Sequence, residues 1–334
     1  MPGRWQIYYR EKPVLTSTLP LTWLTTAALN LNTSDTHIMI FYRAVAWLPF
    51  SVLYAVAWIA YLLLYYVSGY RKTVVRQNLI QAFPDKSDQE ITVLAKKFYR
   101  QLCQVTFEIL KARRMTRGDF HERVNLVNPK LLQDASANFT ESVIVLAIHQ
   151  GNWEWMLHGA ATALNIPVDP VFKPLHNKTA DKLIFDIRSQ FGSRPLSMAE
   201  SAKDILKRRK EFRVFVMVAD QSPTRSERSH WTQFMNQPAA FYVGAQSIAQ
   251  LTGFPVVFAQ CRRRKTGYYD VELHTLASPP YDRKSHDIIE SYVEMAEQCI
   301  QEEPESWLWS NRRWKRDPLA EAAAEQGKAP KTLP

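Results

Sequence analysis

The stretch IVLAIHQGNWEWM (residues 144–156) contains the change of pattern that decides the fold class. It opens on a continuous apolar run, which favours a buried strand, and a Gly-Asn pair then ends that run. Asn152 is a good N-cap, so the spacing predicts a helix that begins there and carries Glu154 in its first turn. His149 is therefore expected at the carboxyl end of a strand, across the bend from that carboxylate.

Strand and helix patterns alternate through most of the chain. Runs rich in β-formers occupy residues 142–148, 168–173, 213–219, 254–261 and 268–273. Helical patterns lie at residues 154–164, 178–190, 199–210, 241–252 and 284–301. This alternation predicts an α/β fold with a central, mostly parallel or mixed sheet flanked by helices. Ligand sites in such sheets lie beyond the carboxyl ends of strands, where His149 is expected.

Composition and charge limit the classes of partner that the chain is expected to bind. The chain has 334 residues, 46% of them hydrophobic, which is enough for a substantial core. Its 42 Lys and Arg against 32 Asp and Glu give a net charge of +10, which favours phospholipid headgroups, nucleic acid or an acidic carrier protein. No nucleic-acid recognition motif is present, so nucleic acid is not expected. The three cysteines are widely spaced without a C-x-x-C pair, so neither a disulfide framework nor a zinc site is indicated.

Residues 44–67 form the most hydrophobic segment and contain no charged residue. As a helix this segment is about 36 Å long, enough to cross a bilayer core. Pro49 and many aromatic residues are also compatible with a helix lying in one leaflet, and a buried helix of a soluble protein is the third reading. The cations Arg71, Lys72 and Arg76 follow the segment, which places the rest of the chain in the cytoplasm by the positive-inside rule.

The chain divides into four predicted parts. Residues 1–38 are an extension of unknown role, and Met39 is an alternative start of the native protein. Residues 39–69 are the membrane-anchoring segment. Residues 70–318 form the catalytic domain, beginning with helical patterns in which Ser87 is expected to be an N-cap. Residues 319–334 are a flexible, alanine-rich tail.

The strand-end histidine suggests a specific chemistry. A carboxylate that accepts a hydrogen bond from one imidazole nitrogen leaves the other nitrogen able to take a proton from a hydroxyl. Glu154 is the expected partner of His149, although a single histidine at a strand end more often has a structural role. The chain has no G-x-S-x-G, H-E-x-x-H, Walker A or G-x-G-x-x-G motif. Direct deprotonation of a substrate hydroxyl therefore remains open, and this chemistry needs no nucleotide, metal or flavin cofactor.

The motif HQGNWE resembles the H-x4-E form of the H-x4-D/E motif of the glycerolipid acyltransferase superfamily. Over about residues 41–318 the chain is similar to the bacterial lipid A biosynthesis (late) acyltransferase family, also called the lysophospholipid acyltransferase family. The resemblance also rests on further motifs in the family's order: GYRKTVVRQNL, FP, FKP, VADQSP, FMNQPAAFYVGAQSIAQLTGFPVV and PESWLWSNRRWKRDP.

The resemblance implies transfer of a fatty acyl chain from acyl carrier protein to a hydroxyl of a lipid acceptor. The acceptor would be a lipid A precursor at the inner leaflet of the bacterial inner membrane. It further implies that His149 is the general base and Glu154 its orienting partner. Arg188 would polarise the acyl-transfer centre, with Arg194 close by as a substrate-binding residue.

The chain departs from the family's pattern at positions that bear on the identity of the acceptor headgroup more than on the type of reaction. Lys173 stands where members often have arginine, and Asn311 precedes Arg312 and Arg313 where members often have histidine. These three cations are expected to bind substrate headgroups, and Asp220 to orient substrate or to cap a turn. Another lysophospholipid or an amino-lipid is therefore the alternative acceptor, and a catalytically silent membrane protein is the alternative of another class.

Overall fold

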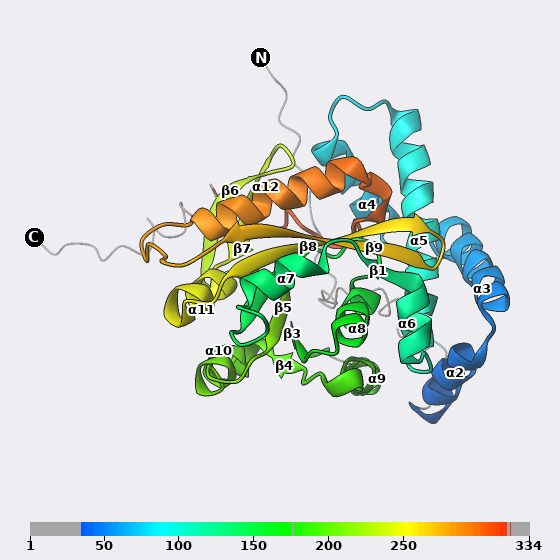
Figure 1. The fold of residues 1–334 in the computed structure, drawn as a ribbon. Coiled ribbons are helices and arrows are strands. Elements are labelled where there is room, and N and C mark those ends of the chain that lie inside the picture. The colour runs from blue at the N-terminus through cyan, green and yellow to red at the C-terminus, as the bar shows by residue number, and fades with distance from the viewer. Residues whose placement is uncertain (1–34, 176, 319–320, 322–334) are drawn as a thin grey trace, which may run out of the picture.

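A seven-stranded sheet runs through the computed structural model, which describes residues 35–175, 177–318 and 321 (Figure 1). Its strand order is β1-β9-β8-β2-β5-β3-β4. The bounds are β1 Val124–Leu126, β2 Val143–Ala147, β3 Val168–Phe172, β4 Leu196–Ser197, β5 Val214–Val218, β8 Val256–Lys265 and β9 Tyr268–Ala277. Neighbouring strands are parallel except for the β8–β9 pair, which is antiparallel. The predicted α/β class with a mostly parallel, mixed sheet is confirmed.

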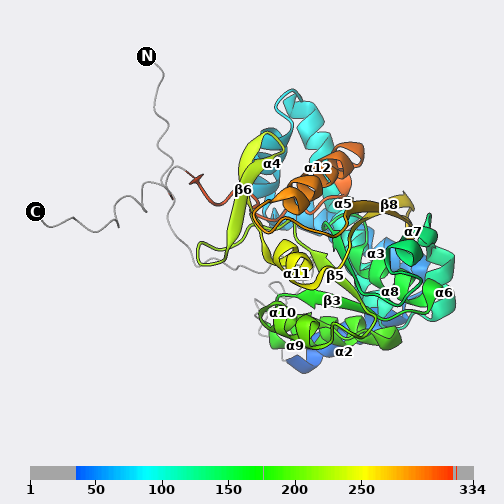
Figure 2. The same ribbon diagram turned by 60° about the vertical axis from the view of Figure 1, so that its left-hand side comes forward.

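Helices cover both faces of the sheet because its central strands are buried on both sides. Along β2, Ile144 and Leu146 belong to one core cluster and Val143 and Val145 to the other. Figure 2 shows α12 on one side of the sheet and α8 with α9 on the other. The helices that flank the sheet are α6 Arg117–Arg123, α7 Pro129–Ala135, α8 Trp153–Leu164, α9 Lys178–Arg188, α10 Met198–Lys207, α11 Gly244–Thr252 and α12 Asp287–Glu302.

The hydrophobic N-terminal segment is broken at Pro49. Helix α2 (Asp35–Trp47) ends before this proline, and α3 (Phe50–Leu62) continues into the π-helical turn η1 (Leu63–Ser68). Together α3 and η1 form one helix of 19 residues that is long and apolar enough to cross a membrane.

Two further helices lead into the domain, α4 (Lys72–Ala82) and α5 (Asp88–Ala112). Ser87 caps α5 in a capping box with Glu90, so the predicted N-cap is confirmed.

A buried carboxylate joins the N-terminal helices to the turn that follows β2. Glu108 of α5 accepts hydrogen bonds from the Tyr54 hydroxyl of α3 (2.9 Å), the Asn152 side chain (2.9 Å) and the Tyr269 hydroxyl (2.6 Å). Asn152 precedes α8, so the hydrogen bonds of this Glu108 hub fix the start of that helix relative to α3.

An antiparallel hairpin that the sequence patterns do not predict lies outside the main sheet. Its strands are β6 (Ser229–Phe234) and β7 (Gln237–Tyr242). The single-turn helices are η2 (Gln190–Gly192) and η3 (Pro304–Ser306). The predicted N-terminal extension and C-terminal tail lie almost wholly outside the described residues, so those predictions stay untested, as does a start at Met39.

Candidate active site

His149 and Asp220 meet because they lie at equivalent positions beyond two adjacent parallel strands. Ala147 at the end of β2 is in register with Val218 at the end of β5, and each of the two polar residues comes two positions later. The His149 Nδ1 atom lies 2.6 Å from Asp220 Oδ1, and the His149 backbone N–H donates to Asp220 Oδ2 at 3.1 Å. Asp220 therefore holds the imidazole by its δ nitrogen and fixes its orientation.

Residues from the C-terminal part of the domain hold this pair in place. The Trp307 indole N–H donates to Asp220 Oδ2 at 2.6 Å, and the Leu308 backbone N–H donates to the His149 carbonyl at 3.0 Å. Burial alone would raise the pKa of Asp220, but His149 and the Trp307 donor outweigh burial and lower it. Asp220 is only 2% exposed, and its contacts suit it to position the histidine. Its predicted contact with substrate stays a prediction.

Glu154 does not pair with His149, contrary to the prediction. It lies in the first turn of α8 as expected, but its side chain is fully buried against α9. Arg188 donates from Nε to Glu154 Oε2 at 2.9 Å and from Nη2 to Glu154 Oε1, and the Trp153 indole also donates to Oε1. Burial would raise the pKa of Glu154, yet the charge and hydrogen bonds of Arg188 lower it. The carboxylate close to His149 in sequence thus belongs to a separate ion pair.

The turn between β2 and α8 needs its glycine. Gly151 has φ +58, and a Cβ on it would overlap the Cys261 carbonyl, so any side chain would push the turn away from β8. Asn152 accepts a hydrogen bond from the Trp155 N–H at 3.0 Å, which confirms it as the N-cap of α8. This turn places His149 and Glu154 on separate elements.

The second imidazole nitrogen faces an apolar pocket. Nε2 of His149 lies 3.2 Å from the Gln221 amide nitrogen, and the Trp153 ring stands edge-on to the imidazole. The pocket has a volume of about 440 Å³, within the range of small-molecule sites. Its walls come from β3, α10, β5 and α11, and its apolar lining includes Val171, Phe172, Met198, Met217, Ile248 and Leu251. His149, Arg188 and Gln221 supply polar groups to the same pocket.

The other predicted substrate-binding cations lie in different places. Lys173 lines the pocket and pairs with Glu227 at 3.1 Å. Arg194 is exposed, pairs with Glu211 at 3.6 Å and is not among the pocket-lining residues. Its role in binding substrate therefore stays a prediction.

Arg312 and Arg313 are neighbours in the chain but differ in their exposure to solvent. Arg312 is exposed, whereas Arg313 is only 1% exposed. The Arg313 guanidinium lies 4.2 Å from the centre of the Phe241 ring and 5.3 Å from that of Phe234. Burial lowers the pKa of Arg313 to about 10, although Asp220 acts in the opposite direction. Arg313 is thus closed off from solvent, and its role in binding an acceptor headgroup stays a prediction.

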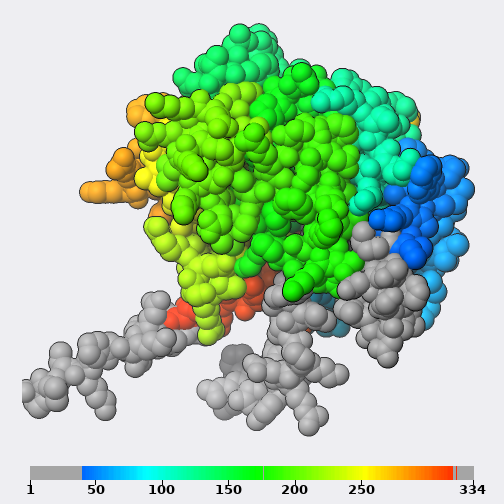
Figure 3. Space-filling view, turned by 90° about the horizontal axis from the view of Figure 1, so that it is seen from below, coloured from blue at the N-terminus to red at the C-terminus, as the bar shows by residue number. Residues whose placement is uncertain are grey.

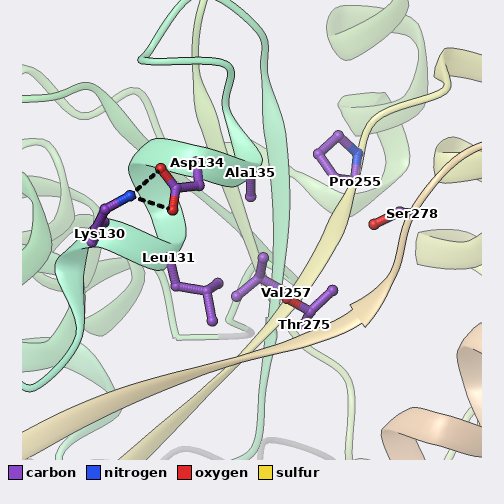
Figure 4. Close-up of a pocket in the computed structure, with 8 residues that line it drawn as sticks. All are labelled: Lys130, Leu131, Asp134, Ala135, Pro255, Val257, Thr275 and Ser278. Carbon is purple, nitrogen blue, oxygen red and sulfur yellow. Dashed lines mark hydrogen bonds and ion pairs between the residues drawn. The ribbon is translucent and has the colours of Figure 1, made fainter.

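A second hollow lies at the opposite end of the sheet. Figure 4 shows it beside α7, lined by the Lys130–Asp134 ion pair together with Val257 and Thr275. Val257 is at the amino end of β8, whereas His149 follows the carboxyl end of β2, which runs parallel to β8. This hollow is therefore not part of the site. Among the described residues, no group of three or more His, Cys, Asp or Glu side chains is suited to hold a metal ion.

A buried histidine behind the Glu154–Arg188 pair should make folding sensitive to acid. The His158 ring is tilted against Phe120 and edge-on to Phe191, and both of its ring nitrogens are buried without a hydrogen-bond partner. Burial lowers the pKa of His158 to about 4 from 6.5, although the charge of Glu154 opposes the shift. Between pH 6.5 and about 4, His158 therefore binds a proton in the unfolded chain but stays neutral in the folded protein.

We expect this histidine to cost about 3 kcal/mol of unfolding free energy as the pH falls from 6.5 to about 4. Urea unfolding of the wild type and a His158→Leu variant across this range measures the difference, which should grow with acidity in favour of leucine. Parallel stability curves for the two proteins would contradict the buried, neutral state of His158.

The fold and the site together define a class of protein. An α/β sheet with a carboxylate-held histidine at the polar end of an apolar pocket suits an enzyme whose substrate has a long apolar part. The chain matches the family model described as bacterial lipid A biosynthesis acyltransferase over residues 29–316. It belongs to this family, which confirms the resemblance seen in the sequence and makes the protein a lipid acyltransferase. No curated protein matches the chain.

Sequence reasoning found His149 and named Asp220 as a site residue, but it did not predict that Asp220, Gln221 and Trp307 surround the histidine. A usable signal existed for Asp220, because VADQSP follows a predicted strand as HQGNWE does, and a parallel sheet brings such ends together. No comparable signal existed for Trp307, which comes from a loop far along the chain.

Proposed function

We propose that this protein transfers a fatty acyl chain from acyl carrier protein to a hydroxyl of a lipid A precursor, with His149 as general base. The observation that carries the proposal is the His149–Asp220 pair, whose second imidazole nitrogen lies beside the Gln221 amide at the lining of an apolar pocket. The family supplies the acyl donor and the lipid acceptor as substrate classes. The pocket then serves as the site of the acyl chain.

In the proposed reaction Asp220 accepts a hydrogen bond from Nδ1–H of His149, so Nε2 carries the lone pair. The acceptor hydroxyl takes the place beside Nε2 that the Gln221 amide now occupies at 3.2 Å. Its oxygen attacks the thioester carbon while its proton passes to Nε2. The tetrahedral intermediate then collapses, the carbon–sulfur bond breaks, and the imidazolium returns the proton to the leaving thiolate.

Arg188 is proposed to stabilise the oxyanion of that intermediate. It lines the pocket, and its two-point contact with Glu154 fixes the plane of the guanidinium. A donor fixed in this way needs no reorganisation as negative charge develops. Glu154 thus serves the reaction through the arginine rather than through the histidine.

The same proposal places the enzyme at the bacterial inner membrane with its catalytic domain on the cytoplasmic side. Family members are typically membrane-associated, and the described part of the chain contains one long apolar helix, Phe50–Ser68. The cations after this helix favour anionic lipid headgroups, and the proposed donor, acyl carrier protein, is present in the cytoplasm. Its excess of positive charge favours an acidic donor protein.

The test is an acyl-transfer assay with purified protein, acyl carrier protein loaded with labelled fatty acid, and a panel of acceptors. The panel contains a lipid A precursor, lysophospholipids and an amino-lipid, and a coenzyme A thioester replaces the donor in a parallel series. Transfer from acyl carrier protein to the lipid A precursor supports the proposal. Transfer only to another acceptor would move the substrate assignment, and no transfer by a folded protein would favour the silent alternative.

The pocket should also set the preferred chain length. Ser201 of α10 is buried and lines the pocket, so Ser201→Phe fills part of the space for the acyl chain. We expect kcat/KM for long acyl donors to fall about ten-fold or more relative to short ones, because the bulky ring excludes terminal methylenes. Ser201→Ala, which leaves the space open, is the matched control. An unchanged chain-length preference in Ser201→Phe would show that the acyl chain binds elsewhere.

A further inference from the structure

An apolar surface lies on the outer side of the N-terminal helices α2, α3 and η1. Each side chain that forms it is between 43% and 77% exposed. This outer apolar face comprises Ile40, Phe41, Trp47, Val52, Trp58, Ile59, Leu63, Tyr66 and Val67. Figure 3 shows the blue N-terminal segment along one side of the molecule. A row of large apolar side chains is unusual on a protein surface that faces only water.

The inner side of the same helices is fixed to the domain. Leu53, Ala57 and Tyr61 of α3 are buried, and α3 and η1 both lie against α5. Lys111 of α5 donates hydrogen bonds to the carbonyls of Ala46 and Leu48 at the break between α2 and α3 (3.0 and 2.8 Å). With the Tyr54–Glu108 hydrogen bond, these contacts hold α2 and α3 along α5.

This packing is incompatible with a helix that crosses the bilayer. A crossing by α3 and η1 would draw α5 into the hydrocarbon beside them. Helix α5 carries the exposed cations Lys97 and Arg100 and the buried Glu108 hub, and charged groups are expensive in the bilayer core. The helices instead have one apolar side and one side bound to protein, which suits insertion into a single leaflet.

Charge along the segment points to an anionic lipid surface. Residues 36–84 contain Arg43, Arg71, Lys72 and Arg76 and no Asp or Glu. The Arg114 guanidinium stacks 3.3 Å from the centre of the Trp47 ring at one end of the face, and Lys72 Nζ lies 4.0 Å from the Tyr65 ring at the other. Cations beside Trp and Tyr are typical of groups at the headgroup level of a membrane.

We propose that the outer apolar face inserts into one leaflet of an anionic bilayer, with α3 and η1 lying in the plane of the membrane and not crossing it. Helix α2 also packs beside α9, which carries Arg188 of the candidate site. This attachment therefore brings the membrane to the side of the domain that holds the acyl pocket. It rests on surface geometry and is independent of the reaction assigned to His149.

The first test measures binding of the full chain to vesicles of phosphatidylethanolamine and phosphatidylglycerol by flotation. The variant carries Trp58→Gln, Ile59→Gln and Leu63→Gln, and the matched control carries Val93→Gln and Val127→Gln, which remove exposed apolar side chains elsewhere. We expect the partition coefficient of the variant to fall about ten-fold or more and that of the control to stay unchanged. Thermal melting confirms that both proteins fold.

The second test distinguishes one leaflet from two. The three native cysteines are buried, so Arg43→Cys and Asp85→Cys each add one exposed thiol, before and after the α3–η1 helix. In spheroplasts, whose intact inner membrane exposes only its periplasmic side, a membrane-impermeant maleimide should label neither position, whereas in inverted membrane vesicles it should label position 85. Labelling of position 43 in spheroplasts, with position 85 protected there, would mean that the helix crosses the bilayer and would overturn the proposal.

Other outcomes also contradict it. Unchanged vesicle binding by the triple variant would show that the face does not meet lipid. Loss of a dimer in that variant, with unchanged vesicle binding, would assign the face to a second copy of the chain. Neither assay needs acyl transfer, so a failure of the proposed reaction leaves both readouts intact.

Discussion

The Asp220→Asn protein is expected to fold normally and to transfer acyl chains about 1,000- to 10,000-fold more slowly than the wild type. An asparagine side chain fits the space but presents an amide, so the imidazole of His149 loses the acceptor that fixes its orientation. The Trp307 indole would still find an oxygen to bond. Initial rates with saturating donor and acceptor measure the loss, and donor affinity should be unchanged.

The matched variant for this prediction is Glu154→Gln, which makes the same chemical change in the other carboxylate. If Glu154 oriented His149, the large loss of rate predicted for Asp220→Asn would appear in Glu154→Gln instead. Asp220→Asn would then retain near wild-type kcat. We also expect substitution of Glu154 to lower the stability of the protein.

Glu154→Ala is expected to lower the free energy of unfolding by about 3–5 kcal/mol, because it leaves the Arg188 guanidinium buried without its carboxylate. The pKa of Glu154 is lowered in the folded protein, so the contribution of this carboxylate is present above its unfolded value of 4.5 and is lost as the pH falls below it. Urea unfolding at neutral and acidic pH measures both effects.

A double variant provides the control for this second prediction. Glu154→Gln with Arg188→Met removes both charges, so its cost in stability should be smaller than the sum for the two single variants. Strict additivity would show that the two side chains do not interact. A loss of activity in Glu154→Ala is thus not by itself proof of a direct catalytic role, since the protein is also destabilised.

The central strands and the helices that follow them could be predicted from local patterns, whereas the short edge strands β1 and β4 lie outside every predicted strand. Predicted strands at residues 142–148 and 213–219 appear as β2 and β5, and the helix expected at residues 154–164 appears as α8. The hairpin β6–β7 was not predicted because its turn is made by Met235 and Asn236, both with positive φ, and lacks the glycine that normally marks such turns. Its signal lies in backbone geometry rather than in composition.

The partner of His149 illustrates what a single sequence cannot supply. Glu154 is five positions away and Asp220 is 71 positions away, yet the sheet order places β5 beside β2. Sequence gives the strand ends but not which strands are neighbours. Arg313 shows the same limit, because a run of cations does not reveal which one turns inward onto Phe234 and Phe241.

The most direct measurement of the central claim is the pH dependence of single-turnover acyl transfer by the wild type and by His149→Gln, between about pH 5 and 9. We predict that the wild-type rate rises with pH, because a general base must be unprotonated to accept the proton of the substrate hydroxyl. His149→Gln should be slower by about 1,000-fold or more at every pH and should lack that rise. A folded His149→Gln protein that keeps a near wild-type rate, or a flat wild-type profile with chemistry rate-limiting, would contradict the role of His149 as the base.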